Sequence, residues 1–395
     1  MVLSVAVIAP GEDHTIQLKF YALGAAFLIA LHVARVTAAE PITLPLLDDQ
    51  AIIRVPVTLL GETRYFAVDT GAPVTIIDAS YRARLVARLR LQSPITSVFE
   101  TEEAIVYRCP ELSIGGIPVD LDEVGCLDIG MIKRITGEPC DGILGMDFLQ
   151  NYVVSMDFDN QTLTIGDRVP EDATRGATTV PLTRMAKNSV GIPAVLNKTL
   201  RLMLMIDSGD TSSVSVNKGN WNNVANPKAK TQRHFRGMLE NPAAETLRVT
   251  VEVEVASHTY PNLLCSRWPR EDATSSLGLA FLRRHVAIFD FPNGVLYLQP
   301  GQHFHDADEA DMSGLHLLRE GGRTFVHSVD EGSPAAAAGI KAGDVLVRLN
   351  GESVPAKTMR DIRQQLRAMD EAEVTLELWR AETLLNITFR LRKVL

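Results

Sequence analysis

Two aspartates in matching surroundings are the residues of this chain best suited to chemistry. Asp69 lies within "YFAVDTGAPVTII" and Asp207 within "LMLMIDSGDTSSVSV". Each motif runs from strand-favouring apolar residues through Asp-Thr/Ser-Gly into further strand-favouring residues. If the two segments meet, their carboxylates share one proton, because like charges in contact do not both ionise. The pair then holds an acid and a base at one place.

Such a pair can hydrolyse an amide bond without a covalent intermediate. The ionised carboxylate takes a proton from water, and the protonated one donates a hydrogen bond to the substrate carbonyl. Gly71 and Gly209 permit a sharp turn and the close approach of another segment. We interpret Thr70 and Ser208 as braces, because their hydroxyls can bond across to the opposite loop. This chemistry needs no metal and no cofactor.

A single Asp-Thr/Ser-Gly is a weak signal, since the same residue types favour surface turns. Here both copies belong to a longer repeat: "VPVTLLGETRYFAVDTG" parallels "IPAVLNKTLRLMLMIDSG", and "DGILGMDFLQNYVVSMDF" parallels "SSLGLAFLRRHVAIFDF". The repeat predicts two β lobes, residues 40–175 and 176–302, that bring Asp69 beside Asp207. The alternative is a carboxylate pair retained for structure or ligand binding in an inactive relative.

The elements around the two motifs read as strands, with hairpin turns at "FDNQ" and "FPNG". One short helix is expected near "ASYRARLVARL". The polar, acidic segment 303–311 reads as a linker. Its His303, His305, Asp306 and Asp308 could ligate a metal, but we favour a solvated connector.

The last segment, residues 312–395, has a different pattern. Two strands with a Gly-Gly turn come first, followed by an Ala-rich helix that ends at Gly339. Met359, Ile362 and Leu366 then share one face of a second helix. Two further strands, "EVTLELWR" and "LLNITFRLR", close the chain.

Composition places the chain among ordinary globular proteins. Its 395 residues are 46% hydrophobic and 22% charged, with a net charge of −9. No run of lysines or arginines stands out, which argues against nucleic acid as a partner.

The N-terminus reads as an export signal. Lys19 precedes the apolar run Phe20–Leu31, and small residues lead to a cleavage site after Ala39. We expect a cleaved signal and a periplasmic or secreted protein. An uncleaved segment that associates with the membrane is the alternative.

Four cysteines, Cys109, Cys126, Cys140 and Cys265, form no C-x-x-C pair. In an exported protein they allow one or two disulfides, with a bridge inside the first repeat favoured. Buried free thiols are the alternative.

The repeat resembles the pepsin and retropepsin-like aspartic proteases over residues 45–300. Asp69-Thr70-Gly71-Ala72 with Ile143-Leu144-Gly145, and Asp207-Ser208-Gly209 with Leu277-Gly278, carry the likeness. It implies a mainly β, bilobal, double-barrel fold with one catalytic aspartate per lobe and a substrate cleft between them.

Two features depart from that family pattern. Ser276 stands where an apolar residue is usual, and the flap region, residues 93–107, lacks a Gly-rich tip. Tyr107 lies where the family has a flap tyrosine; a core position is its alternative.

The C-terminal segment resembles a PDZ domain of the kind attached to bacterial exported proteases. Ser313-Gly314-Leu315-His316-Leu317 and "GSPAAAAGIKAGDVLVRLNG" carry this likeness. It implies that the first stretch captures a peptide C-terminus through backbone N–H groups. The peptide would lie between the strand from Leu315 and the helix that carries Met359 and Ile362. A PDZ domain that only packs on the protease, or mediates assembly, is the alternative.

The sequence therefore predicts an exported aspartic endopeptidase with a C-terminal PDZ domain. Its partners would be a polypeptide substrate and a peptide C-terminus. A non-catalytic peptide-binding scaffold is the second interpretation, and a membrane-anchored adaptor is the third.

Overall fold

The structure, a computed structural model, describes residues 40–86, 88–96, 101–224, 232–235, 245–367 and 369–393. The expected signal or anchor segment, residues 1–39, lies outside the described residues. From the described part onward the chain forms one compact unit. Within the described residues, no helix is both long and apolar enough to cross a membrane.

The first lobe is built on a mixed sheet whose central strands β5 and β11 are buried along their whole length. Among the described residues its order is β6-β7-β10-β5-β11-β4-β3-β8-β9, with β2 (Leu47–Asp48) added to β3. The bounds are β3 Ile53–Leu59, β4 Glu62–Val68, β5 Ile76–Asp78, β6 Arg88–Thr96, β7 Thr101–Arg108, β8 Leu112–Ile114, β9 Ile117–Pro118, β10 Glu123–Leu127 and β11 Gly142–Leu144. Helices α1 (Gly130–Thr136) and α2 (Met146–Leu149) flank β11.

The second lobe repeats this arrangement, as the sequence repeat predicted. Its described strands run β15-β16-β17-β22-β18-β21-β20-β19, and a β16–β20 pairing folds the sheet back on itself. The bounds are β15 Thr183–Arg184, β16 Val190–Leu196, β17 Leu200–Asp207, β18 Val214–Val216, β19 Gln232–Phe235, β20 Glu245–Val255, β21 His258–Arg267 and β22 Ser276–Gly278, with α3 Lys218–Val224 and α4 Leu279–Leu282.

A parallel pairing in each lobe sets the loop that carries the aspartate. In the first lobe β4 pairs with β11, so that Val68 lies opposite Leu144. In the second lobe β17 pairs with β22, so that Asp207 lies opposite Gly278. The downstream apolar-apolar-Gly landmark of each repeat is therefore the strand beside its own aspartate.

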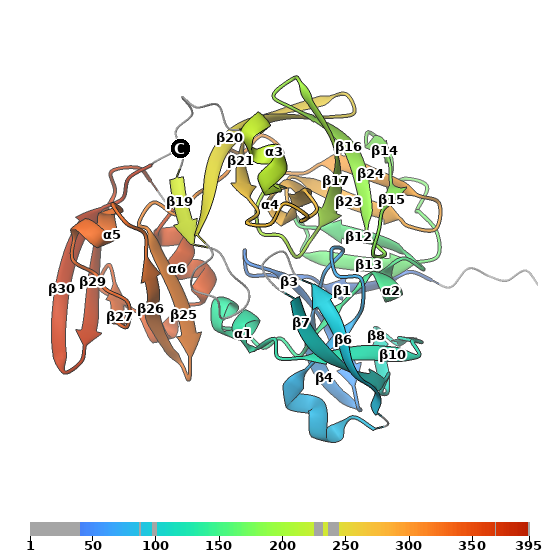
Figure 1. Cartoon of the computed structure of the whole chain (residues 1–395), viewed down its shortest axis with the longest axis horizontal. Helices are drawn as coiled ribbons and strands as arrows, with labels where there is room; N and C mark the ends of the chain where they lie inside the picture. The colour runs from blue at the N-terminus through green and yellow to red at the C-terminus, as the bar shows by residue number, and fades with distance from the viewer. Residues whose placement is uncertain are drawn as a thin grey trace, which may run out of the picture. The chain divides into compact units, whose positions relative to one another are not determined.

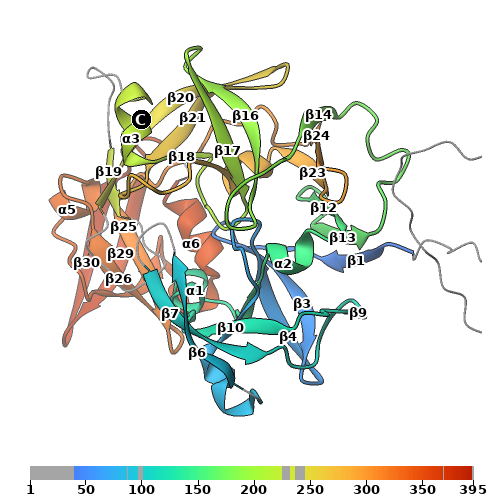
Figure 2. The ribbon, with the colours of Figure 1, turned by 45° about the vertical axis from the view of Figure 1, so that its right-hand side comes forward.

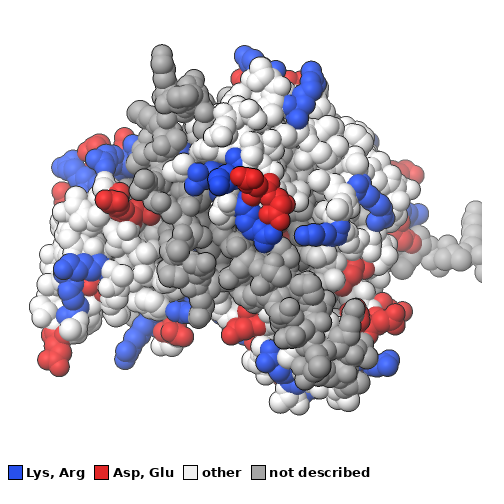
Figure 3. Space-filling view, in the orientation of Figure 1, with Lys and Arg blue, Asp and Glu red and all other residues white. Residues whose placement is uncertain are grey.

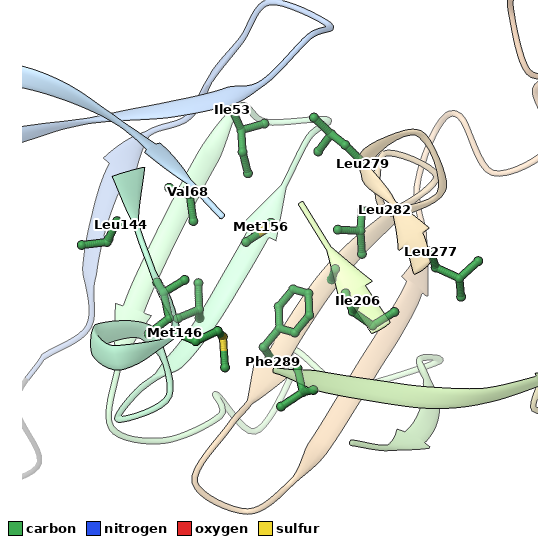
Figure 4. Packing of buried hydrophobic residues seen from close by; sticks show 14 of the residues in the cluster. Ile53, Val68, Leu144, Met146, Met156, Ile206, Leu277, Leu279, Leu282 and Phe289 are labelled. Atoms are coloured by element: carbon green, nitrogen blue, oxygen red, sulfur yellow. The ribbon is translucent and has the colours of Figure 1, made fainter. Parts of the chain in front are cut away.

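A third sheet joins the lobes. Its order is β1-β13-β12-β23-β24-β14, with β1 Ile42–Pro45, β12 Val153–Asp157 and β13 Thr162–Gly166 from the first lobe, and β14 Thr178–Pro181, β23 His285–Asp290 and β24 Val295–Pro300 from the second. Apolar residues of both lobes pack into one cluster, including Val68 and Leu144 with Ile206 and Phe289 (Figure 4). The predicted mainly β, bilobal fold is confirmed.

The C-terminal domain has its own core. Its described strands are β25 Leu315–Glu320, β26 Arg323–Val329, β27 Val345–Leu349, β28 Glu352–Ser353, β29 Glu373–Arg380 and β30 Thr383–Arg390. Helices α5 (Pro334–Ala337) and α6 (Met359–Gln365) complete it, with the short 3₁₀ turn η2 (Val354–Ala356) before α6 (Figure 1). Strand β25 lies at one edge of the sheet.

The short helix expected near residues 79–89 is present as the 3₁₀ helix η1 (Ala79–Arg84), which ends before the chain enters β6 at Arg88. The favoured prediction of a disulfide inside the first repeat was wrong. No disulfide forms among the four cysteines, which all remain free. Cys126 and Cys265 lie in the main core, whereas Cys140 lies in a separate cluster.

Charged residues are spread over the described surface. Lysines and arginines are interspersed with aspartates and glutamates on the face shown in Figure 3. This mixed pattern agrees with the absence of a basic run in the sequence.

Candidate active site

Asp69 follows the last residue of β4 and is held by its own loop. Its backbone N–H donates to the Leu144 carbonyl at 3.1 Å. Its Oδ1 accepts hydrogen bonds from the N–H groups of Gly71 (2.8 Å) and Ala72 (3.0 Å). The carboxylate therefore has a fixed orientation at the end of a buried strand.

Asp207 ends β17 and has the same local geometry. Its Oδ1 accepts from the N–H groups of Gly209 at 2.9 Å and Asp210 at 3.1 Å. The side chain is 9% exposed. Each aspartate thus accepts two N–H groups of its own turn, which stabilises the ionised form of either one.

Thr70 and Ser208 connect the two loops through four hydrogen bonds. Thr70 Oγ1 donates to the Ile206 carbonyl at 2.8 Å, and Ser208 Oγ donates to the Val68 carbonyl at 2.8 Å. The N–H of Thr70 donates to Ser208 Oγ, and the N–H of Ser208 donates to Thr70 Oγ1, both at 3.0 Å. Both side chains are fully buried. This reciprocal network fixes the separation of the two aspartates.

The two glycines leave the space that the opposite carboxylates need. A Cβ added to Gly71 would lie 2.4 Å from Asp207 Oδ1, and one added to Gly209 would lie 2.4 Å from Asp69 Oδ2. Real Cβ atoms do not come this close to other atoms. Each loop backbone therefore packs directly against the carboxylate of the other lobe, which places Asp69 and Asp207 together.

The pKa values of Asp69 and Asp207 are both shifted by their surroundings. Burial raises the pKa of Asp69, while hydrogen bonds from Gly71 and Ala72 oppose this. The pKa of Asp207 is raised further, by burial and then by the negative charges of Asp69 and Asp210. These surroundings favour the protonated form of both carboxyls, as expected where two acids share one buried site.

Asp210 is a third carboxylate at the site, and sequence reasoning did not single it out. Its side chain is 2% exposed. Ser276 Oγ donates to its Oδ2 at 2.8 Å, and the N–H of Ser212 donates to its Oδ1 at 2.9 Å. Ser276, which differs from the family pattern, is therefore bonded to a second residue that differs between the repeats. The first lobe has Ala72 at the position of Asp210. Comparing the two repeats position by position would have found the pair.

A hydroxyl further along each loop is bound by a carboxylate. In the first lobe Asp147 of α2 accepts from the N–H and the Oγ1 of Thr75, at 2.8 and 2.7 Å. In the second lobe Ser213 Oγ donates to Asp308 at 2.8 Å. Asp308 comes from the segment between the second lobe and the C-terminal domain.

Asp308 is an exception to the solvated connector expected over residues 303–311, in which His303, His305 and Asp306 are exposed. The Asp308 side chain is 6% exposed and pairs with Arg284 at 2.6 Å. It also accepts the N–H of Leu264. His303 bonds Asp306 on the surface. Among the described residues, no group of three or more histidine, cysteine, aspartate or glutamate side chains could hold a metal.

A small pocket opens beside Asp69. Its walls come from both lobes and from α1, and its lining residues are Ile52, Ala67, Val68, Ile132, Ile143, Ser208 and Gly209. The walls are mostly apolar. Ile132 of α1 is part of this lining.

The flap position is different from the family pattern. The hairpin of β6 and β7 occupies the flap region, and its tip, residues 97–100, lies outside the described residues. Tyr107 lies near the end of β7, 7% exposed, within the main hydrophobic core. It therefore has the core position that we kept as the alternative to a flap tyrosine.

The residues predicted to bind a peptide in the C-terminal domain are mostly buried. Leu315, Leu317 and Ile362 belong to the domain's core, and so does Met359. His316 is partly buried, with its Nε2 2.8 Å from Asp330. Gly314 has the left-handed φ of +78° that its place in the loop requires.

Comparison with known families agrees with these two parts of the chain. Residues 55–148 match the family model described as "Aspartyl protease", and residues 325–380 match the one described as "PDZ domain". The predicted aspartyl protease region and C-terminal PDZ domain are thereby confirmed.

Curated relatives match only short parts of the chain. The "Na(+)/H(+) exchange regulatory cofactor NHE-RF2" of Oryctolagus cuniculus is 42% identical over 59 residues, which cover 14% of this chain and 19% of that protein. A "Probable CtpA-like serine protease" of Staphylococcus aureus (strain COL) is 27% identical over 93 residues, 23% of this chain and 19% of that protein. The chain thus spans about a fifth of the length of these relatives.

Among solved structures, an aspartic proteinase from Irpex lacteus matches with a TM-score of 0.43 and 14% sequence identity. The match covers 68% of this chain and 99% of that one.

Proposed function

We propose that the chain is an aspartic endopeptidase that hydrolyses peptide bonds with the Asp69/Asp207 pair. The reciprocal packing of Gly71 against Asp207 and of Gly209 against Asp69 is the observation that carries this proposal. It supports two carboxylates in contact within a buried setting, the arrangement in which one proton is shared.

The electrostatic difference between the two aspartates assigns their roles. Asp69, the ionised member, takes a proton from the attacking water, and Asp207 donates a hydrogen bond to the substrate carbonyl. As water adds, the Asp207 proton neutralises the developing negative charge on that oxygen. The amine then leaves with a proton from Asp69, while a hydroxyl of the collapsing diol returns a proton to Asp207, which restores the pair. Thr70 and Ser208 hold the two groups at the required separation throughout.

The test is cleavage of a peptide library across a range of pH. We expect Asp69→Asn and Asp207→Asn each to reduce kcat/KM by at least about 100-fold, the loss typical of a general acid or base. Asp172→Asn is the matched control, because that side chain is 87% exposed. Cleavage that survives both substitutions would contradict the proposal. A folded wild type that binds the library without cleaving it would favour the non-catalytic scaffold.

The PDZ domain and the N-terminus extend this proposal. A PDZ domain suggests peptide binding, and we propose that its ligand is a peptide or protein C-terminus.

We also keep export, through the segment before Ala39, as a proposal. N-terminal sequencing of the mature protein tests export, since a start after Ala39 is expected for a cleaved signal.

A further inference from the structure

The loop expected to receive a peptide carboxylate already holds one from its own chain. Asp311 Oδ1 accepts hydrogen bonds from the N–H groups of Ser313 at 2.9 Å and Gly314 at 2.6 Å. It also accepts from Ser313 Oγ at 2.8 Å, and that hydroxyl in turn accepts from the Leu315 N–H at 3.0 Å. The N–H groups of Ser313, Gly314 and Leu315 are therefore directed at internal oxygens.

Positive charge also gathers around this internal carboxylate. Arg367 lies just beyond the C-terminal end of α6. Burial lowers its pKa, and the negative charges of Asp311 and Glu309 oppose that effect. A cation beside a bound carboxylate stabilises it. Asp311 thus has the surroundings that a peptide terminus would need, supplied within the chain.

The other end of the groove is filled by the first lobe. Helix α1 contacts both β25 and α6, and it lies next to them in both views (Figures 1 and 2). It ends at Gly137, whose φ is +72°. A Cβ added to Gly137 would lie 2.8 Å from Met359 Cγ on α6 and 3.1 Å from Arg319 Cδ on β25. The end of α1 therefore lies between the strand and the helix that border the groove.

Polar contacts hold α1 in this position. Arg363 of α6 donates to the Ile135 carbonyl, one of the carbonyls at the end of α1 that lack a partner within the helix. The Arg134 guanidinium lies 5.9 Å from the ring centroid of Phe325 on β26. One residue of α6 reaches further, since Arg360 donates to the Asp48 carbonyl at 2.9 Å. The contact is thus specific and involves several groups on each side.

We propose that the PDZ groove is closed in cis. Asp311 takes the place of a terminal carboxylate, and the end of α1 with Gly137 takes the place of the ligand residues before it. A C-terminal peptide of another chain binds only after both have moved. Since Ile132 of α1 lines the pocket beside Asp69, that movement also displaces one wall of the site. This last consequence rests on the proposed peptidase function, whereas the closure itself does not.

Peptide binding to the full chain tests the closure. The probe is a fluorescein-labelled pool of decapeptides with four randomised C-terminal residues, prepared as free acid and as amide. All proteins carry Asp69→Asn, so that hydrolysis does not interfere and the result does not depend on peptidase activity. The variants are Asp311→Ala, which frees the loop N–H groups, and Gly137→Ala, which pushes α1 away from Met359. Gly176→Ala is the matched control, because its φ is +77° and no atom lies within 4 Å of the added Cβ.

We expect each variant to bind the free acid at least about tenfold more tightly than the parent and the control, because a smaller fraction of its molecules has a closed groove. The amide should gain nothing. Equal affinity for the free acid in the parent and the variants would overturn the proposal. If either variant fails to fold, Arg363→Ala replaces it, since it removes only the contact with the Ile135 carbonyl.

Discussion

The two lobes build the same loop with different chemistry around it. Both place an aspartate at the end of a buried strand, and Thr70 and Ser208 bridge the loops in matching ways. The surroundings of the aspartates differ. Beside Asp69 the loop continues with Ala72, whereas beside Asp207 it continues with the buried carboxylate of Asp210. A symmetric backbone therefore carries an asymmetric charge distribution.

The supports of the two loops differ in origin as well. Thr75 binds Asp147, which belongs to the same lobe. Ser213 binds Asp308, which arrives from the segment that leads to the PDZ domain. The Thr75 hydroxyl is thus bound within its own lobe, whereas the Ser213 hydroxyl depends on a residue beyond its lobe.

This difference teaches how a repeat acquires two roles. A shared proton needs one carboxyl with a higher pKa, and identical surroundings would give no preference. The extra negative charge lies in the second lobe, and our proposal makes Asp207 the acid and Asp69 the base. The lobes can therefore be compared directly by paired substitutions.

The largest effect is expected where the lobes are most alike. Gly71→Ala and Gly209→Ala each place a Cβ 2.4 Å from the opposite carboxylate, so the pair cannot keep its geometry. We expect both to reduce kcat/KM by at least about 100-fold, since each disrupts the acid–base pair. The measurement is steady-state cleavage of one library peptide. Gly219→Ala is the control, because its Cβ would meet no atom closer than 3.5 Å.

The next effect is a difference in the free energy of unfolding between matching substitutions in the two lobes. Asp308→Ala removes the partner of Arg284, whose side chain is 7% exposed, and leaves a buried cation unpaired. The expected loss in free energy of unfolding is about 3–5 kcal/mol. Asp147→Ala removes a carboxylate that binds only neutral donors at Thr75 and its neighbours, so its loss should be smaller. Urea denaturation of both variants measures the difference. A larger loss for Asp147→Ala would contradict the comparison.

The third effect is a pH dependence of stability that only the second lobe should have. His285 titrates near neutral pH in an unfolded chain, and the first lobe has Tyr152 at the same position of the repeat. His285 is 1% exposed, 2.9 Å from the Tyr260 hydroxyl and 3.1 Å from the Phe281 carbonyl. Burial lowers the pKa of His285 to about 4. The folded state favours the neutral ring, so stability is complete above the ordinary pKa of 6.5 and falls as pH decreases toward about 4.

The full loss amounts to roughly 3 kcal/mol, at about 1.4 kcal/mol per pKa unit. His285→Gln removes the titrating group and should flatten the decrease of Tm between about pH 6.5 and pH 4. His303→Gln, at a side chain 62% exposed, should leave it unchanged. An unaltered slope in His285→Gln would place the acid sensitivity elsewhere.

The sequence was sufficient for what the two lobes share and insufficient for what they do not. Asp69, Asp207, Thr70 and Ser208 were predictable because the repeat places each in the same local pattern. Ser276 and Asp210 lie far apart in the chain, so a comparison of the two repeats marks both as departures but only the structure shows their bond. Asp308 was misjudged because an acidic segment is typical of a linker. Its ion pair with Arg284 is a tertiary contact that the sequence does not show.

The smallest and most specific effect concerns Asp210 itself. Its negative charge raises the pKa of both Asp69 and Asp207. Asp210→Asn keeps the shape and the bond from Ser212, and its amide N–H would donate to Ser276 Oγ instead of accepting from it. The substitution removes the charge, so both pKa values should fall. The whole activity–pH profile should then move to lower pH with little change in its maximum.

Ser276→Ala is the control for that shift, because it removes a hydrogen bond to Asp210 while the charge stays. Its profile should remain close to that of the wild type. If Asp210→Asn leaves the profile in place, the charge of the second lobe does not set the working pH. The assignment of Asp207 as the acid would then rest on burial and on the charge of Asp69 alone. If Ser276→Ala shifts the profile as far as Asp210→Asn, the hydrogen bond rather than the charge distinguishes the two lobes.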